Sequence, residues 1–288
     1  MQKSSSERCL IHPCFDKGAE KKYARVHLPV APFCNVQCNF CNRKFDCVNE
    51  SRPGVTSRLL EPRQVIAYLE KAFEIFPDTA VVGIAGPGDP FASPDLTLET
   101  FYRVRAAFPD VHLCVSTNGL NLAPYVSDLR SLKVGYATIT INAVYPTIGA
   151  KIYSWVRKDG KRLAGNTAAE ELLSNQLEAL DKLVDAGIRT KVNTVVLPGI
   201  NLDHVTDIAR TAQKMGVAMI NCIPLIPVKD TSFETMDSPS RESMKEIRKE
   251  VRQYLPSMDH CARCRADAVG FLFGNQHYDT ENKLCGNM

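Results

Sequence analysis

The sequence predicts an α/β fold: a partial (β/α)6, TIM-like barrel with irregular N- and C-terminal extensions. Three observations support this prediction. Apolar runs of strand length alternate with amphipathic stretches of helix length, the alternation occurs six times, and later helices end at glycines such as Gly187 and Gly216. Such alternation is typical of right-handed βαβ units around a parallel sheet, and six units are too few for a closed eight-unit barrel.

The expected elements follow a polar, irregular segment, residues 1–22. Strands are expected at Ala24–Ala31, Thr79–Ala85, His112–Ser116, Val134–Asn142, Thr190–Val196 and Val217–Ile223. Helices are expected at Glu61–Phe76, Leu96–Ala107, Leu122–Leu132, Ala168–Ala186, Leu202–Met215 and Arg241–Tyr254. From Leu255 onward the sequence is irregular again. We therefore expect an N-terminal extension (1–22), a barrel (23–255) and a C-terminal tail (256–288).

The composition is that of a globular protein, with 44% hydrophobic and 23% charged residues in 288. The net charge of +3 is small and the charges are interspersed, so no nucleic-acid partner is expected. No apolar run reaches the roughly 18 residues that would span a bilayer. The N-terminus also lacks the apolar stretch of a secretory signal. We expect a cytoplasmic protein without membrane contact.

Eleven cysteines in such a chain indicate metal binding or catalysis rather than disulfides. Three of them, Cys34, Cys38 and Cys41, follow the first expected strand with the spacing C-x3-C-x2-C. A [4Fe–4S] cube usually takes four thiolates, so three leave one iron open. An open iron can chelate the amino and carboxylate groups of S-adenosylmethionine (SAM). One electron then breaks the S–C5′ bond and releases a 5′-deoxyadenosyl radical.

Zinc is the alternative ligand for these cysteines. Structural zinc favours paired C-x2-C knuckles, or Cys and His sets closed to four ligands. A C-x3-C-x2-C loop at the head of a six-unit α/β chain fits that pattern poorly, so the iron–sulfur interpretation is preferred.

The cysteine motif resembles that of the radical SAM superfamily, which implies a partial barrel of the radical SAM type with the cluster loop after its first strand. After the second expected strand, Gly86-Pro87-Gly88-Asp89 resembles the family's glycine-containing motif, which meets the amino group of SAM. The resemblance implies cofactor-binding roles for Gly86, Gly88 and Asp89. Glycines there allow close backbone approach.

Two asparagines follow the third and fourth expected strands, Asn118 and Asn142. In parallel α/β folds, function collects at the carboxyl ends of the strands. Polar contacts to the carboxylate or ribose of SAM are therefore expected from these side chains. The alternative is that each is a turn residue or a strand-end cap.

Five more cysteines need an explanation: Cys14, Cys47, Cys114, Cys261 and Cys264. Cys114 lies in the third expected strand, and alternation predicts that it faces the barrel interior. Cys261 and Cys264 form a C-x2-C pair in the tail. If both termini fold over the mouth of the barrel, these thiols meet above the SAM site.

The combination resembles the nitrogenase cofactor maturases of the NifB family, from about residue 12 to residue 267. The matching strings are His12-Pro13-Cys14, Tyr23-Ala24-Arg25-Val26-His27, the cysteine loop from Cys34 to Cys47, Asn49-Glu50-Ser51-Arg52-Pro53-Gly54 and Gly83-Ile84-Ala85-Gly86-Pro87-Gly88-Asp89-Pro90. The resemblance implies three [4Fe–4S] clusters: one that binds SAM and two auxiliary modules. It also implies that a SAM methyl moves onto a cluster sulfide and loses hydrogen to a second SAM's radical. Fusion of the modules would then give a carbide-centred, eight-iron precursor of the nitrogenase cofactor.

The resemblance also implies ligand sets for the auxiliary modules. We assign Cys47 and Cys114, with one histidine, to one module, and Cys14, Cys261 and Cys264 to the other. Neutral imidazole binds iron and makes a reasonable labile ligand.

His27 is the first choice for that histidine, because its strand leads directly into the cysteine motif. His12 is the second choice, because it lies close to Cys14 in the sequence. The alternative for His27 is a buried histidine that is hydrogen-bonded within the barrel.

Converting a methyl group into a carbide releases protons, so a proton acceptor near the clusters is expected. Glu50, on the same loop as the cysteines, is the candidate. A surface salt bridge is the alternative role for this residue.

Two other functions remain possible at this stage: a radical SAM maturase that modifies peptides, and a non-catalytic iron–sulfur carrier. The NifB-like interpretation implies several partners: a donor of iron–sulfur clusters, an electron donor such as a ferredoxin, and a carrier or scaffold that receives the product. The chain stops soon after the tail cysteines, so it resembles the short, stand-alone form of the family.

Overall fold

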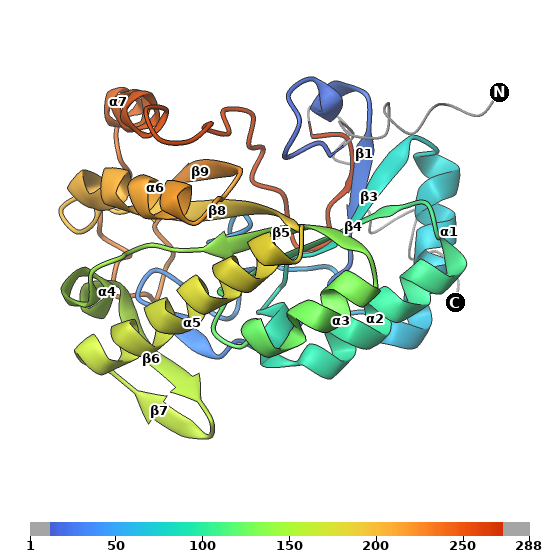
Figure 1. Ribbon diagram of the computed structural model, residues 1–288, viewed down its shortest axis with the longest axis horizontal. Helices are drawn as coiled ribbons and strands as arrows, with labels where there is room; N and C mark the ends of the chain where they lie inside the picture. The colour runs from blue at the N-terminus through green and yellow to red at the C-terminus, as the bar shows by residue number, and fades with distance from the viewer. Residues whose placement is uncertain (1–11, 273–288) are drawn as a thin grey trace.

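The framework of the protein is a curled, seven-stranded sheet, seen in a computed structural model that describes residues 12–272 (Figure 1). In sheet order the strands are β10 (Val269–Gly270), β1 (Ala24–His27), β3 (Thr79–Ile84), β4 (His112–Thr117), β5 (Val134–Thr140), β8 (Arg189–Val196) and β9 (Met219–Pro224). Every pair from β1 to β9 is parallel, and β10 alone pairs antiparallel, with β1. The predicted partial barrel of six parallel strands is confirmed.

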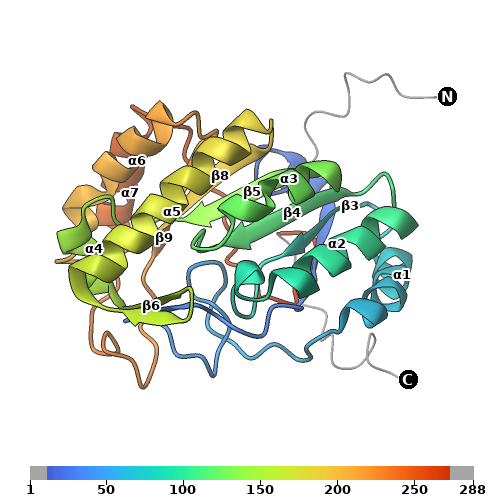
Figure 2. The same ribbon diagram turned by 60° about the horizontal axis from the view of Figure 1, so that its bottom comes forward.

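Helices line one face of this sheet, as Figure 2 shows. They are α1 (Val65–Ile75), α2 (Pro94–Ala107), α3 (Val126–Ser131), α5 (Gly165–Asp185), α6 (Val205–Lys214) and α7 (Arg241–Val251). Short 3-10 turns precede three of them: η3 (Pro62–Gln64), η5 (Ala123–Tyr125) and η6 (Leu202–His204). All six predicted helices are present, and the predicted bounds include these turns.

Strand β4 illustrates that the two faces of the sheet differ: one packs against the helices in the hydrophobic core, and the other faces the inside of the barrel. Leu113 and Val115 are fully buried in the main hydrophobic core, beneath the helices. Cys114 and Ser116 alternate with them and point to the opposite face, where they line an inner cavity. The strand pattern therefore delivers polar and sulfur-bearing side chains to the barrel interior, as predicted for Cys114.

The first strand ends earlier than the sequence predicted, at His27 instead of Ala31. Pro29 has no amide hydrogen to donate, so the ladder is interrupted there. The chain nevertheless stays beside β3: Leu28 N donates to Gly83 O at 2.8 Å, and Ala31 forms an isolated bridge with Pro87. This contact starts the long cysteine loop, residues 28–61.

A small second sheet was not predicted. It consists of β2 (Val36–Cys38), β6 (Tyr153–Lys158) and β7 (Lys161–Leu163), and β6 follows a short helix, α4 (Pro146–Ile152). The turn between β6 and β7 is Asp159-Gly160, with φ of 48° and 74°. Asp-Gly flanked by strand residues is a strong hairpin signal that the sequence prediction overlooked. Through β2 this sheet anchors the cysteine loop.

Helices α4 and α5 pack very closely where Gly149 meets Ala169. A Cβ atom on Gly149 would lie 2.8 Å from the Cβ of Ala169. Helix α4 leads directly into β6, in which Tyr153 is paired with Cys38. The spacing of α4 and α5 therefore positions β6, the strand that pairs with Cys38 of the predicted triad.

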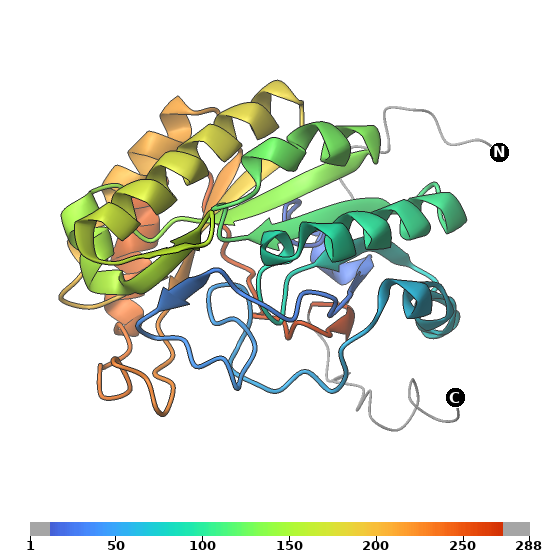
Figure 3. The ribbon, with the colours of Figure 1, turned by 90° about the horizontal axis from the view of Figure 1, so that it is seen from below.

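The two ends of the described chain pack on different parts of the barrel: residues 12–22 contact β5 and β8, and the tail pairs with β1. Residues 12–22 contact the barrel through an Asp16–Arg189 ion pair of 2.5 Å and through Phe15, which packs on Tyr136. The tail (residues 256–272) returns along β1, and Figure 3 shows it in red beside the blue cysteine loop. None of the helices within residues 12–272 has the length and apolar character needed to cross a membrane.

We predict that Gly149→Ala destabilises the protein. Alanine favours a helix over glycine by about 0.5–1 kcal/mol, but overpacking costs about 1–3 kcal/mol, so the steric effect should prevail. The midpoint of urea unfolding should fall. Gly135→Ala in β5 is the matched control, because nothing lies within 4 Å of its added Cβ. A midpoint raised by Gly149→Ala would contradict the close packing.

Candidate functional site

The three cysteines of the predicted triad lie on one turn of the cysteine loop. The Gln37 side chain closes this turn, because its Nε2 donates to the carbonyl oxygens of Cys38 and Cys41 at 3.0 and 2.6 Å. Phe40, between them in sequence, is fully buried and packs near Phe233. The loop conformation thus depends on bonds from its own residues and on an aromatic anchor.

Two side-chain amides are directed at the sulfurs. Asn118 Nδ2 lies 3.8 Å from Cys34 Sγ, and Asn49 Nδ2 lies 3.6 Å from Cys38 Sγ and 3.7 Å from Cys47 Sγ. Amide donors of this kind tune and orient cluster thiolates. Asn49 was not predicted as a site residue. It connects the triad to Cys47, which the sequence assigned to an auxiliary module.

Burial and mutual proximity perturb the thiols. Burial raises the pKa of Cys34 to about 12, and the Asp89 carboxylate adds to the effect. Burial and the neighbouring Cys41 raise the pKa of Cys38 well above its usual value. Such thiols are protonated at neutral pH without metal, so binding iron must release protons. The buried sulfurs and aimed amides together fit a cluster held by three thiolates.

The glycine motif contacts the cysteine loop itself. Gly88 N donates to Ala31 O, and Asp89 N donates to Phe33 O, both at 2.6 Å. A Cβ on Gly88 would lie 2.0 Å from Phe33 O. No residue but glycine fits here, because the neighbouring atom belongs to the backbone. Gly86, with φ of 143°, approaches Ala266 of the tail.

Asp89 connects two loops. Its buried carboxylate accepts hydrogen bonds from Phe91 N at 2.9 Å, from Thr117 Oγ1 at 2.9 Å and from Asn118 N at 2.6 Å. The loop after β3 is thereby tied to the loop after β4. In this structure the predicted cofactor-binding carboxylate positions Asn118, whose side chain reaches Cys34.

The two predicted asparagines differ in their surroundings. Asn118 caps Leu120 N through Oδ1 at 2.9 Å while its Nδ2 faces Cys34. Asn142 is almost fully buried; its Oδ1 accepts from Val195 N at 2.8 Å, and its Nδ2 donates to Asn49 at 3.1 Å. The geometry of Asn142 matches the strand-end cap that the sequence left open as its alternative.

A separate cavity of about 60 Å³ lies inside the barrel. Its lining contains most of the remaining predicted residues, contributed by both ends of the chain as well as by the sheet: His12, Cys14, His27, Glu50, Cys114, Cys261 and Cys264. We call this the inner cavity. Thiols from both ends of the described chain therefore line one cavity inside the barrel, although Cys14 packs against Tyr136 and Met219 near the starts of β5 and β9 and not at the mouth where the SAM site is expected.

Cys47 lies apart from that lining, against the triad. Its amide donates to Pro87 O at 3.1 Å. Burial, and then the neighbouring thiols of Cys41 and Cys34, raise its pKa well above the usual value. The structure thus brings Cys114 and His27 into one cavity. It places Cys47, which the sequence assigned to the same module, nearer the cysteine triad.

His27, Gly83 and Cys114 form a row across three adjacent strands, since His27 pairs with Gly83 and Gly83 with Cys114. All three line the inner cavity. Gly83 contributes no side chain, so the space between the imidazole and the thiol stays open. A Cβ there would lie 3.5 Å from His27 Cδ2 and 3.7 Å from Cys114 Cβ.

The two candidate histidines present different nitrogen atoms. His27 Nδ1 is 3.2 Å from the carbonyl oxygen of Arg265, so Nδ1 carries the proton and Nε2 keeps a free lone pair. Burial lowers the pKa of His27 to about 4, which keeps the ring neutral. His12 Nδ1 instead accepts from Cys14 N at 3.1 Å, which places its proton on Nε2. Only His27 therefore offers the neutral, unprotonated nitrogen that iron requires.

The tail cysteines approach β1 through an arginine that the sequence prediction passed over. Arg25 Nη2 donates to Cys264 Sγ at 2.9 Å, and Nη1 donates to the carbonyl of Gly270. This contact fastens the Cys264 side chain to β1. Arg25 lies within the segment Tyr23-Ala24-Arg25-Val26-His27, which resembles the NifB family. An arginine in a strand does not by itself indicate a metal site, so the sequence offered no reason to select it.

Glu50 projects into the inner cavity and makes no surface contact there. Ser116 Oγ, Thr140 Oγ1 and Asn193 Nδ2 all donate to its carboxylate. Burial raises its pKa to about 7. A carboxyl with that pKa can accept and release a proton near neutral pH. The predicted role of a proton acceptor is chemically available to this side chain.

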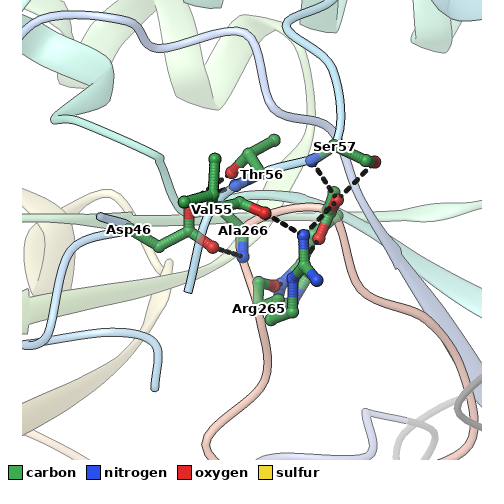
Figure 4. Close-up of polar contacts among 8 residues, drawn as sticks. Asp46, Val55, Thr56, Ser57, Arg265 and Ala266 are labelled. Atoms are coloured by element: carbon green, nitrogen blue, oxygen red, sulfur yellow. Dashed lines mark hydrogen bonds and ion pairs between the residues drawn. The ribbon is translucent and has the colours of Figure 1, made fainter. Parts of the chain in front are cut away.

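The tail is fastened to the cysteine loop by a set of polar contacts, which we call the tail clamp (Figure 4). Asp267 accepts from Ser57 N at 2.9 Å and from Ser57 Oγ at 2.7 Å. Arg265 forms an ion pair with Asp267 and donates to Val55 O, while Asp46 accepts from the amide of Ala266. The clamp holds Cys261 and Cys264 over the cavity.

Residues 28–212 match the Radical SAM superfamily, and the chain belongs to it. Within that superfamily it is similar to two curated proteins described as FeMo cofactor biosynthesis protein NifB. The protein of Chlorobaculum tepidum is 50% identical over 91% of this chain and 62% of its own length. That of Klebsiella pneumoniae is 42% identical over 93% of this chain and 58% of its own length. The chain thus spans about three-fifths of these relatives.

Solved structures share the fold. Streptococcus suis SuiB bound to S-adenosylmethionine aligns with a TM-score of 0.58 and 12% identity, covering 82% of this chain and 50% of SuiB. Methylornithine synthase PylB aligns with a TM-score of 0.55 and 14% identity, covering 83% of this chain and 65% of PylB. At such identities the likeness concerns the architecture alone.

We predict that Asp267→Ala loosens the tail. The change removes the acceptor for Ser57 and the partner of Arg265, and each hydrogen bond lost costs about 0.5–1.5 kcal/mol. In iron-free protein, maleimide should label Cys261 and Cys264 faster. Asp259→Ala is the control, because Asp259 lies in the same tail in an exposed ion pair with Arg252 and should leave labelling unchanged. Equal rates in both variants would contradict the clamp.

Proposed function

We propose that this protein is a radical SAM enzyme of nitrogenase cofactor biosynthesis. It fuses two [4Fe–4S] modules and a SAM-derived carbon into an eight-iron, carbide-centred precursor. The relatives named for FeMo cofactor biosynthesis support the pathway. The observation that carries the chemistry is the cysteine loop, which supplies both the SAM-cluster triad and Glu50 in the wall of the inner cavity. A radical made at the triad then has a thiol-lined chamber beside it.

In this proposal Cys34, Cys38 and Cys41 hold the resident cluster, and Asn118 and Asn49 direct their amides at its thiolates. When SAM is bound, this cluster supplies the electron that cleaves it. Gly88 keeps the two loops in contact, and Asp89 fixes Asn118, so the pocket for SAM is organised before SAM arrives.

Side chains that line the inner cavity supply the ligands for the two iron–sulfur modules, which are the substrate. His27 Nε2 and Cys114 bind one module, with Cys47 on the side of the triad, and Cys14, Cys261 and Cys264 bind the other. Arg25 orients Cys264 by donating to its sulfur. Glu50 accepts a proton that leaves the transferred carbon, and the hydroxyls of Ser116 and Thr140, which donate to its carboxylate, hold that carboxylate in place.

Three partners follow from this chemistry. A cluster donor must supply the modules, a one-electron donor such as a ferredoxin must reduce the SAM cluster, and a carrier or scaffold must accept the product. The tail clamp anchors the tail whose Cys261 and Cys264 line the inner cavity, so it is the element that delivery and release would displace.

We predict that Cys34→Ala abolishes formation of 5′-deoxyadenosine while the auxiliary iron remains. Anaerobically reconstituted wild type should bind about twelve irons per chain and the variant about eight. Product is measured after reduction with dithionite in the presence of SAM. Cys222→Ala is the control, because Cys222 is a buried thiol in the main core and should leave iron and cleavage unchanged.

The result also separates the alternatives. Wild type that binds about twelve irons and forms no 5′-deoxyadenosine would indicate a carrier. Wild type that cleaves SAM with only about four irons would contradict the two-module substrate.

We further predict that Gly83→Ala selectively weakens the module at His27 and Cys114. The added methyl makes ordinary contacts of 3.5 Å or more, so the fold is kept, but it fills the gap between imidazole and thiol. Iron should fall by about four per chain with SAM cleavage retained. Gly135→Ala, on β5 two strands away, should retain all iron. Full iron content in Gly83→Ala would remove this row from the ligand assignment.

A further inference from the structure

Strand β8 carries a lysine into the inner cavity. Lys191 is only 6% exposed, and its side chain is part of the cavity lining. Its Nζ lies 3.8 Å from Met258 Sδ and 5.1 Å from the centre of the Phe15 ring. Across residues 12–272, no carboxylate forms an ion pair with it. Burying an ammonium group without a paired anion costs free energy, so Lys191 is expected to lower the stability of the folded protein.

The other charged groups around this cavity are already engaged. Arg25 donates to Cys264 Sγ and to the backbone of the tail. Arg263 donates to the carbonyl oxygens of Pro224 and Val48. Glu50 is bonded to three neutral donors. Lys191 is therefore the cation of the cavity whose only contacts among residues 12–272, the Met258 sulfur and the Phe15 ring, are with uncharged and weakly polar groups, so it is available to an anion.

Lys191 lies between the two proposed sets of thiols. It lines the inner cavity together with one thiol of each set, Cys14 and Cys114. The Phe15 ring beneath its Nζ packs against the same two thiols. One ammonium group thus lies close to a proposed ligand of each module.

A second donor faces the same space. His12 is 3% exposed, and its Nε2 has no hydrogen-bond partner. Because Nδ1 accepts from Cys14 N, Nε2 carries the hydrogen and can only donate. An unsatisfied buried N–H beside an unpaired buried ammonium indicates an acceptor-rich, anionic occupant.

We propose that Lys191, assisted by the Nε2–H of His12, is the counter-charge that allows two anionic iron–sulfur modules to lie side by side in the inner cavity. This inference rests on the proposed function. Thiolate-bound clusters are anionic and repel one another, and the repulsion is strong in a low-dielectric interior. Lys191 offsets that repulsion at the place where the modules must meet. His12 acts as a hydrogen-bond donor to a cluster sulfide, not as an iron ligand.

The test compares Lys191→Met, which keeps the length of the side chain without its charge, with Lys191→Arg, which keeps the charge. In reconstituted protein, Lys191→Met should bind about eight irons per chain instead of about twelve, and the module that remains should show a more negative reduction potential. Lys191→Arg should retain about twelve. The SAM cluster is the internal reference, and its potential should not change. Lys214→Met on α6 is the matched control for loss of an exposed lysine.

Urea unfolding of the iron-free protein distinguishes the proposed role of Lys191 from a purely structural one. Without clusters, Lys191→Met should unfold at a higher urea concentration than wild type, because a buried charge has been removed. A lower midpoint would assign Lys191 to the stability of the fold and overturn the proposal.

The proposal is also overturned if Lys191→Met binds about twelve irons with unchanged potentials while wild type does the same. Wild type that binds only about four irons would instead contradict the proposed function, so the two failures are distinguishable.

Discussion

The contact between the backbones of Gly88 and Phe33 is the constraint on which the rest of the site depends. It brings the loop after β3 against the start of the cysteine loop with no room for a side chain. Cys34 follows Phe33 directly, and Asp89 follows Gly88, so one contact aligns a cluster thiol with the carboxylate that fixes Asn118. The β2–β6 pairing and the tail clamp then secure the same loop from two other directions. Cluster geometry here is a property of backbone packing as much as of cysteine spacing.

The inner cavity illustrates how one environment prepares ligands of different kinds. Burial keeps imidazole neutral and thiols protonated, which are uncharged forms that an apolar interior tolerates. Iron converts the thiols to thiolates and thereby introduces negative charge. Arg25 and Lys191 already lie in the wall of that cavity, and the proposed function would use their positive charge to offset the charge of the thiolates.

The sequence predicted the six parallel strands, the six main helices and the thiols that converge inside the barrel, because each depends on periodicity or on the chemistry of a residue type. It overlooked β2, which has three residues and exists only by pairing with β6. It also passed over Asn49 and Lys191, since an asparagine or lysine in a strand-rich chain carries no local signal. Their roles arise from tertiary contacts between residues far apart in sequence, such as Asn49 with Asn142.

The wall of the inner cavity joins opposite ends of the polypeptide: His260 Nε2 lies 3.0 Å from the carbonyl oxygen of Pro13, 247 residues away. Closing a loop of that length costs more conformational entropy than any contact between successive βα units. The barrel can thus form from near neighbours first, and the inner cavity is completed only when residues 12–22 meet the tail. Folding would then occur in two steps: the barrel forms first, and the inner cavity is enclosed second.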